Sequence, residues 1–166
     1  MRIIVFAVLS LITATIISCR DDDMALPPIT QRGANTFGCR IDNKIYVPEN
    51  GGAGSRAEVL NDRIVVLGGA DNVTITLQII DSIKPIVVNQ PYEFEKGVKR
   101  KCEYLSWTKS SSCLYGDDPI SGSITFSKID RINGIVSGTF EFTAFSKECN
   151  KSAAITDGRF DIRLDH

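Results

Sequence analysis

The sequence predicts an all-β protein: an antiparallel meander of about nine or ten strands that forms a β-sandwich or an incompletely closed barrel. Three observations predict it. From Thr36 onward apolar and polar residues alternate, turn-forming residues recur about every ten positions, and no run shows a convincing helical period. The chain of 166 residues suits a single domain with one core.

The first strands are predicted as hairpins. Asp42-Asn43 is a two-residue turn pair that tolerates positive φ, and alternating strand positions precede and follow it. A second hairpin is expected around Asn61-Asp62, with residues 68–72 as the next turn. The run 73–79 then alternates aliphatic residues with Thr and Gln, which predicts a strand with one buried and one solvated face.

Further strands follow with the same alternation. Turns are expected at 131–134 and 156–158, where Asn, Asp and Gly permit left-handed backbone. The mostly short connections predict that strands adjacent in sequence are adjacent in space. The remaining predicted strands cover residues 88–94, 101–107, 112–115, 123–127, 136–143 and 160–164.

The N-terminus predicts an export signal. Arg2 precedes an apolar run from 3 to 17 that is short for a membrane span, which is typical of a secretory signal. The run ends in Ile16-Ile17-Ser18-Cys19, which resembles a bacterial lipobox. The resemblance implies that residues 1–18 are removed and that Cys19 carries diacylglycerol and an acyl chain such as palmitate. We expect residues 19–35 to form a flexible tether and 36–166 the folded domain.

Three aspartates follow the expected lipidation site. Asp21, Asp22 and Asp23 resemble the acidic export signal of Bacteroidetes lipoproteins, which implies an outer-membrane protein facing the cell exterior. The alternative is that they form part of a solvated tether.

The cysteines indicate disulfides. Without Cys19 four remain, and an even number in an exported chain is typical of two bridges with three possible pairings. We expect Cys102–Cys113 across a hairpin and Cys39–Cys149 between the first strand and the last loop. A zinc site is not expected, because the spacings lack close ligand pairs.

Known catalytic patterns are missing, so no enzyme activity and no cofactor are expected. The only histidine is the C-terminal His166, where chain ends fray. Asp117-Asp118 and the pair Asp157 and Asp161 are interpreted as turn formers or solvated strand residues. A net charge of −1 argues against nucleic acid as a partner.

Two patterns suggest surface roles. Lys99 and Arg100 belong to the one basic cluster and lie near Tyr104 and Trp107 in sequence, and cations with aromatics suit an anionic glycan. The alternative is that the lysines protect a sheet edge.

Ser82, within Asp-Ser-Ile, resembles an O-glycosylation acceptor of exported Bacteroidetes proteins.

Four motifs stand out along the chain: LPPITQ at 26–31, TFGC at 36–39, SGTFEF at 137–142 and ITDGRFD at 155–161. Together they resemble a family of uncharacterised Bacteroidetes lipoproteins. The resemblance covers nearly the whole mature chain and implies location and fold, because the family has no assigned activity. We therefore expect a non-catalytic, surface-exposed lipoprotein that binds an extracellular ligand such as a glycan, or else a structural or accessory subunit of an envelope complex. An exposed aromatic platform would favour the former and a large apolar patch the latter.

Overall fold

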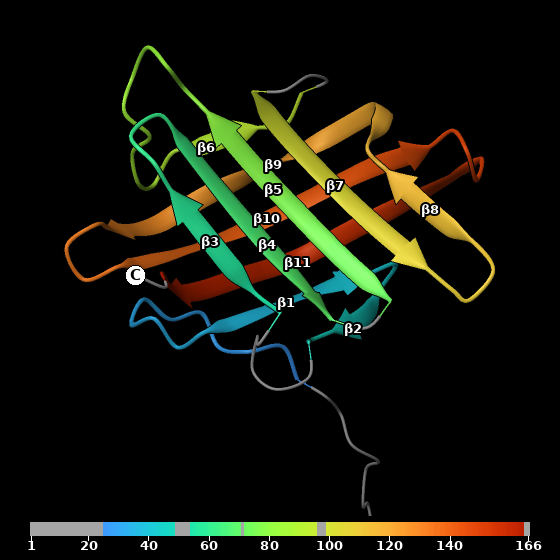
Figure 1. Cartoon of the computed structure of the whole chain (residues 1–166), viewed down its shortest axis with the longest axis horizontal. Coiled ribbons are helices and arrows are strands. Elements are labelled where there is room, and N and C mark those ends of the chain that lie inside the picture. The colour runs from blue at the N-terminus through green and yellow to red at the C-terminus, as the bar shows by residue number, and fades with distance from the viewer. Residues whose placement is uncertain (1–24, 49–53, 71, 96–98, 165–166) are drawn as a thin grey trace, which may run out of the picture.

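The computed structural model describes residues 25–48, 54–70, 72–95 and 99–164. These residues form eleven antiparallel strands and no helix, arranged as two sheets that do not close on each other (Figure 1). The all-β prediction is confirmed, with a β-sandwich as the arrangement. The expected signal sequence, Cys19 and Asp21 to Asp23 lie outside the described residues. No helix among the described residues is long and apolar enough to cross a membrane.

The two sheets differ in how far they follow sequence order. In the six-stranded sheet the order is β2 (Lys44–Tyr46), β1 (Thr36–Ile41), β11 (Lys151–Arg163), β10 (Ile135–Ser146), β9 (Asp117–Asp130) and β6 (Pro91–Glu93). The five-stranded sheet has the order β3 (Arg56–Val59), β4 (Arg63–Ala70), β5 (Val73–Ile80), β7 (Arg100–Trp107) and β8 (Ser112–Tyr115). Neighbours in sequence pair as predicted in most places. The exceptions are β1 with β11, β5 with β7 and β6 with β9.

The core lies between the inner faces of the sheets. Along β10, buried residues alternate with more exposed ones from Phe140 onward, as the sequence predicts. The ring of Phe37 in β1 packs 5.3 Å from that of Phe140 and also covers Gly68 of the opposite sheet. A Cβ at Gly68 would lie 2.5 Å from the Phe37 ring, so this position requires glycine for the sheets to approach.

The turns match the sequence in one place and differ in another. Asp42 and Asn43 have φ of 47° and 67°, which confirms the predicted two-residue turn. Residues 156–158, predicted as a turn, instead lie inside β11. Asp157 has φ of 52°, and the pairing register of β11 shifts there against both β1 and β10. The left-handed residue therefore makes a β-bulge rather than a chain reversal.

The predicted disulfide pairing is wrong. Cys113 in β8 is bonded to Cys149, while Cys39 and Cys102 are free and buried. The register explains the difference. Cys113 lies opposite Ser106, four residues along β7 from Cys102, and four residues of strand span about 13 Å. The bridge therefore joins β8 to the turn after β10, across the two sheets.

Candidate functional site

The segment 25–35, predicted as part of a flexible tether, is bound to the six-stranded sheet. Its anchor is Asp161 of β11, whose side chain is only 1% exposed, although the sequence suggests a solvated position. A carboxylate held by several N–H and O–H donors is well compensated for its burial. The donors to Asp161 are Thr30 Oγ1 (2.5 Å), Ser137 Oγ (2.7 Å) and the backbone N–H groups of Gly33 (2.8 Å), Arg32 (3.1 Å) and Ala34 (3.1 Å).

Asp161 is a structural anion. Burial by itself would raise its pKa, but the hydrogen bonds from Thr30, Ser137, Gly33 and Ala34 outweigh burial and lower the pKa to about 2. The carboxylate therefore stays ionised at neutral pH. A permanently ionised, fully bonded carboxylate can hold the segment in place, whereas it is a poor proton donor.

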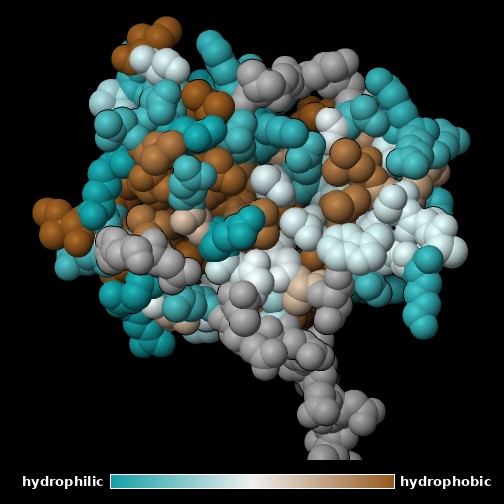
Figure 2. All heavy atoms as spheres, in the orientation of Figure 1, coloured by the Kyte–Doolittle hydropathy of each residue, from teal (hydrophilic) through white to brown (hydrophobic). Residues whose placement is uncertain are grey.

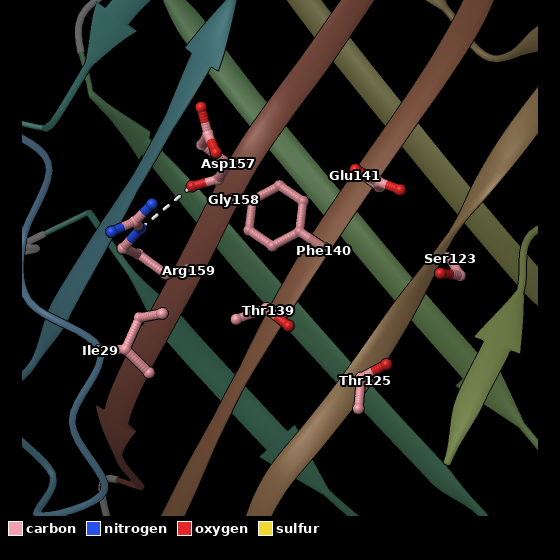
Figure 3. A pocket seen from close by; sticks show the side chains of 9 residues that line it. All are labelled: Ile29, Ser123, Thr125, Thr139, Phe140, Glu141, Asp157, Gly158 and Arg159. Carbon is pink, nitrogen blue, oxygen red and sulfur yellow. Dashed lines mark hydrogen bonds between the residues drawn. The ribbon is translucent and has the colours of Figure 1, made fainter. Parts of the chain in front are cut away.

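The docked segment forms one wall of a trough on the outer face of the six-stranded sheet (Figure 3). Ile29 forms this wall, and 60% of its surface is exposed to solvent. Across the floor, Thr125, Thr139 and Arg159 lie opposite one another on β9, β10 and β11. The hollow measures about 320 Å³, and its remaining lining residues are Ser123, Phe140, Glu141, Asp157 and Gly158.

Several polar groups in the trough are available to a ligand. Among the described residues, the side chains of Ser123, Thr125, Thr139 and Glu141 have no hydrogen-bond partner. The three hydroxyls both donate and accept, and the carboxylate accepts two or more bonds. The trough thus combines an apolar wall with a floor of donors and acceptors that no other protein group engages.

The two charged residues at the β11 side of the trough are fixed by the bulge. Arg40 Nε of β1 binds the Asp157 carboxylate at 3.1 Å. Arg159 Nε donates to the backbone oxygen of Asp157 at 3.0 Å, the dashed line in Figure 3. This arrangement presents a guanidinium and a carboxylate at defined positions. No group of three or more His, Cys, Asp or Glu side chains among the described residues is arranged to hold a metal ion.

Comparison with known proteins identifies the domain. A family model described as "Domain of unknown function (DUF6252)" matches residues 36–161, about three quarters of the chain. The chain belongs to this family. No curated protein and no solved structure matches the chain. The match begins at the predicted domain start and ends at Asp161, so the residue that holds the N-terminal segment closes the matched region.

The predicted aromatic platform is not assembled in this DUF6252 domain. Tyr104 and Trp107 are three residues apart on β7 and so point to opposite faces of the sheet. Tyr104 faces inward, stacked on Tyr115 with ring centroids 5.0 Å apart, and burial raises its pKa. Trp107 lies on the outer face and is partly exposed.

The predicted basic residues lie at the other end of β7. Arg100 is seven residues from Trp107, about 23 Å along the strand. Its guanidinium stands 5.9 Å from the ring centroid of the buried Tyr92. Lys99 and Arg100 line a second hollow of about 380 Å³, whose other lining residues include Ser82, Ile83 and Lys84. The basic residues and Ser82, separate in the sequence analysis, are thus brought together, while the aromatics are not.

Sequence reasoning missed the trough. Its residues appear in the sequence only as the solvated side of two alternating strands, and such a pattern is common to all half-exposed sheets. The available signal was the run of hydroxyl and acidic residues at alternate positions of β9 and β10. The wall at Ile29 had no sequence signal, because it depends on docking to Asp161, 132 residues away.

Proposed function

We propose that this protein is a non-catalytic outer-membrane lipoprotein of the Bacteroidetes type, anchored through Cys19 and facing the cell exterior, which binds a glycan in the trough. The observation that carries the binding role is the set of polar side chains without a protein partner beside an exposed aliphatic wall. Sugars present hydroxyls together with apolar C–H faces, and they require both kinds of contact from a site.

The charges of the trough favour a neutral or zwitterionic glycan. The Asp157 carboxylate is already paired with Arg40, so Arg159 and Glu141 leave one positive and one negative charge to face a ligand. A carboxylate is a strong acceptor for sugar hydroxyls. The basic hollow at Lys99 and Arg100 lies on the other sheet and is a separate surface.

The docked segment supports a close association with the membrane. Arg159 Nη1 approaches the backbone oxygen of Pro27 at 3.5 Å, and Pro27 also covers Gly38. Pro27 is eight residues from Cys19, which corresponds to a reach of at most about 28 Å. A lipid on Cys19 would therefore keep the domain next to the bilayer, rather than on the longer tether that the sequence suggests.

The anchor is tested by substitution. Cys19→Ala is expected to move the protein from the membrane fraction to the soluble fraction, because no acyl chain would then hold it. Fractionation followed by immunoblotting measures this. The control is the triple replacement of Asp21, Asp22 and Asp23 by alanine, which should stay with the membrane but lose cleavage by protease added to intact cells. Membrane retention of Cys19→Ala would refute the anchor.

Ligand binding is tested with a glycan array and titration of the best binder. Thr139→Val and Glu141→Gln are each expected to weaken binding about tenfold, since each removes or weakens a hydrogen bond worth roughly 1–1.5 kcal/mol. Thr76→Val on the outer face of the other sheet and Glu148→Gln beyond β10 are the matched controls. Equal losses in the controls, or an array without any binder, would contradict the glycan proposal.

A further inference from the structure

Exposed aliphatic side chains gather at one end of the sandwich. Seven large hydrophobic residues among those described are exposed, and five of them lie in three connections at this end. Ile83 is 86% exposed and Ile132 is 92% exposed, which leaves both almost entirely in water. We name this set the apolar end; its members are Leu60, Ile83, Val87, Val88 and Ile132.

Hydrogen bonds hold the three connections together. The N–H of Asp81 donates to the Asp62 oxygen at 2.8 Å, which fixes the β5–β6 connection beside the β3–β4 turn. Arg131 Nη2 donates to the Leu60 oxygen at 2.8 Å, which fixes the β9–β10 turn beside the same turn. In Figure 1 these connections lie at the left and upper left, and Figure 2 shows brown side chains projecting from the same margins.

The rim of the apolar end carries charges of both signs, and several of its exposed side chains are cationic. Lys84, Lys99 and Arg131 are exposed around it. Two of the nearby acids are engaged locally: the Asp81 carboxylate accepts the N–H groups of Ile83 and Lys84, at 3.1 and 3.0 Å. Asp130 is likewise bonded to Asn133 and Lys128. The other charged residues here are Arg100, Asp62, Glu95 and the ion pair of Arg63 with Glu58.

We propose that the apolar end inserts into a lipid surface. Aliphatic side chains with Lys and Arg beside them complement acyl chains and lipid phosphates. All five members are Ile, Leu or Val, whose hydrocarbon side chains transfer favourably into a bilayer. They also project from turns, which suits insertion between lipids. This surface lies apart from the trough, and its role does not depend on glycan binding.

The insertion needs little intrinsic affinity. A protein anchored to a membrane experiences a high effective concentration of lipid. Even a weak contact between the apolar end and the bilayer would therefore be formed most of the time. The contact would fix how the domain is oriented on the bilayer. A single apolar tip contributes too little for stable binding alone, but several tips act together.

The test places an environment-sensitive fluorophore on the full-length protein reconstituted in vesicles of phosphatidylethanolamine with some phosphatidylglycerol. The labels are attached singly to Ile83→Cys, Ile132→Cys and, as the control at the far end of β7, Lys109→Cys. Cys39 and Cys102 are buried, with pKa values raised to about 12 mainly by burial, so they do not compete for the label. Labels at 83 and 132 should shift to shorter wavelength and be quenched by acyl-chain spin labels, while the label at 109 should show neither effect.

A second variant keeps the test informative if a label disturbs its own tip. Val88→Asp should reduce the quenching of the label at 132 about tenfold, because a carboxylate resists transfer into lipid. Leu114→Asp, at an exposed leucine of β8 outside the apolar end, is the matched control and should leave quenching unchanged. Labels at 83 and 132 that emit in vesicles at the same wavelength as in water, without quenching, would overturn the proposal. A shift that appears only when envelope proteins are added would instead assign the apolar end to a protein partner.

Discussion

Replacing Asp161 by asparagine is expected to lower the free energy of unfolding by about 3 kcal/mol, because it breaks a buried network of charge-assisted hydrogen bonds. An asparagine at this position would direct an NH₂ group at donors such as the Thr30 hydroxyl and the Ala34 N–H. Urea unfolding at neutral pH measures the loss. Hydrogen exchange at Gly33 and Ala34 should accelerate as well, because the segment loses its anchor.

The matched control is Asp157→Asn, four residues away on the same strand. The Asp157 side chain is 54% exposed and forms an ion pair with Arg40. Exposed pairs of this kind contribute at most about 1 kcal/mol, so the control should change stability only slightly. Similar losses in both variants would contradict the structural role of Asp161.

The pKa of Asp161 predicts how the free energy of unfolding depends on pH. Its folded pKa of about 2 lies below the reference value of 3.8, so the ionised form stabilises the fold. The sign follows from linkage: this contribution is complete above about pH 5 and is lost as pH falls through the folded pKa near 2. A shift of this size corresponds to about 2 kcal/mol. The stability gap between wild type and Asp161→Asn should therefore narrow between pH 5 and pH 2. A constant gap would show that the charge contributes nothing.

The sequence predicts local structure here because alternation and turn chemistry are local properties. The Asp42-Asn43 turn and the buried face of β10 follow from residues within a few positions of each other. The strand 112–115 is predicted with its observed bounds. In contrast, residues 88–90 read as strand but only Pro91–Glu93 pairs with β9, since pairing depends on a distant partner.

Long-range features could not be predicted from the sequence for the same reason. The pairing of β1 with β11 and the docking of Thr30 on Asp161 join residues more than 100 positions apart. The disulfide prediction failed because it needed the register of β7 with β8. Gly33 and Asn35, which both have positive φ, were the available signal that the segment before β1 is a shaped loop and not a free tether.

Removing the disulfide is expected to have the largest effect on stability. Cys113 and Cys149 are 36 residues apart, and closing a loop of that length stabilises a fold by about 4 kcal/mol through the unfolded chain. The double variant Cys113→Ser and Cys149→Ser should unfold at correspondingly lower urea concentration. Reduced wild type should match the variant, and reductant should not change the variant further. Unchanged stability after reduction would refute this role for the bridge.

Loss of the bridge should also loosen β8, because of where the bridge lies. β8 has four residues and forms the edge of the five-stranded sheet, and among the described strands it pairs with β7 alone. Apart from the bridge, the link from Gly116 N–H to the Phe145 oxygen, at 3.2 Å, connects this edge to the other sheet. So short an edge strand is weakly held. Hydrogen exchange of β8 should therefore rise in the double variant more than that of β4, which is paired on both sides.

In the lipidated protein, denaturation should expose two reactive thiols, Cys39 and Cys102. A count of four reactive thiols would contradict the pairing of Cys113 with Cys149.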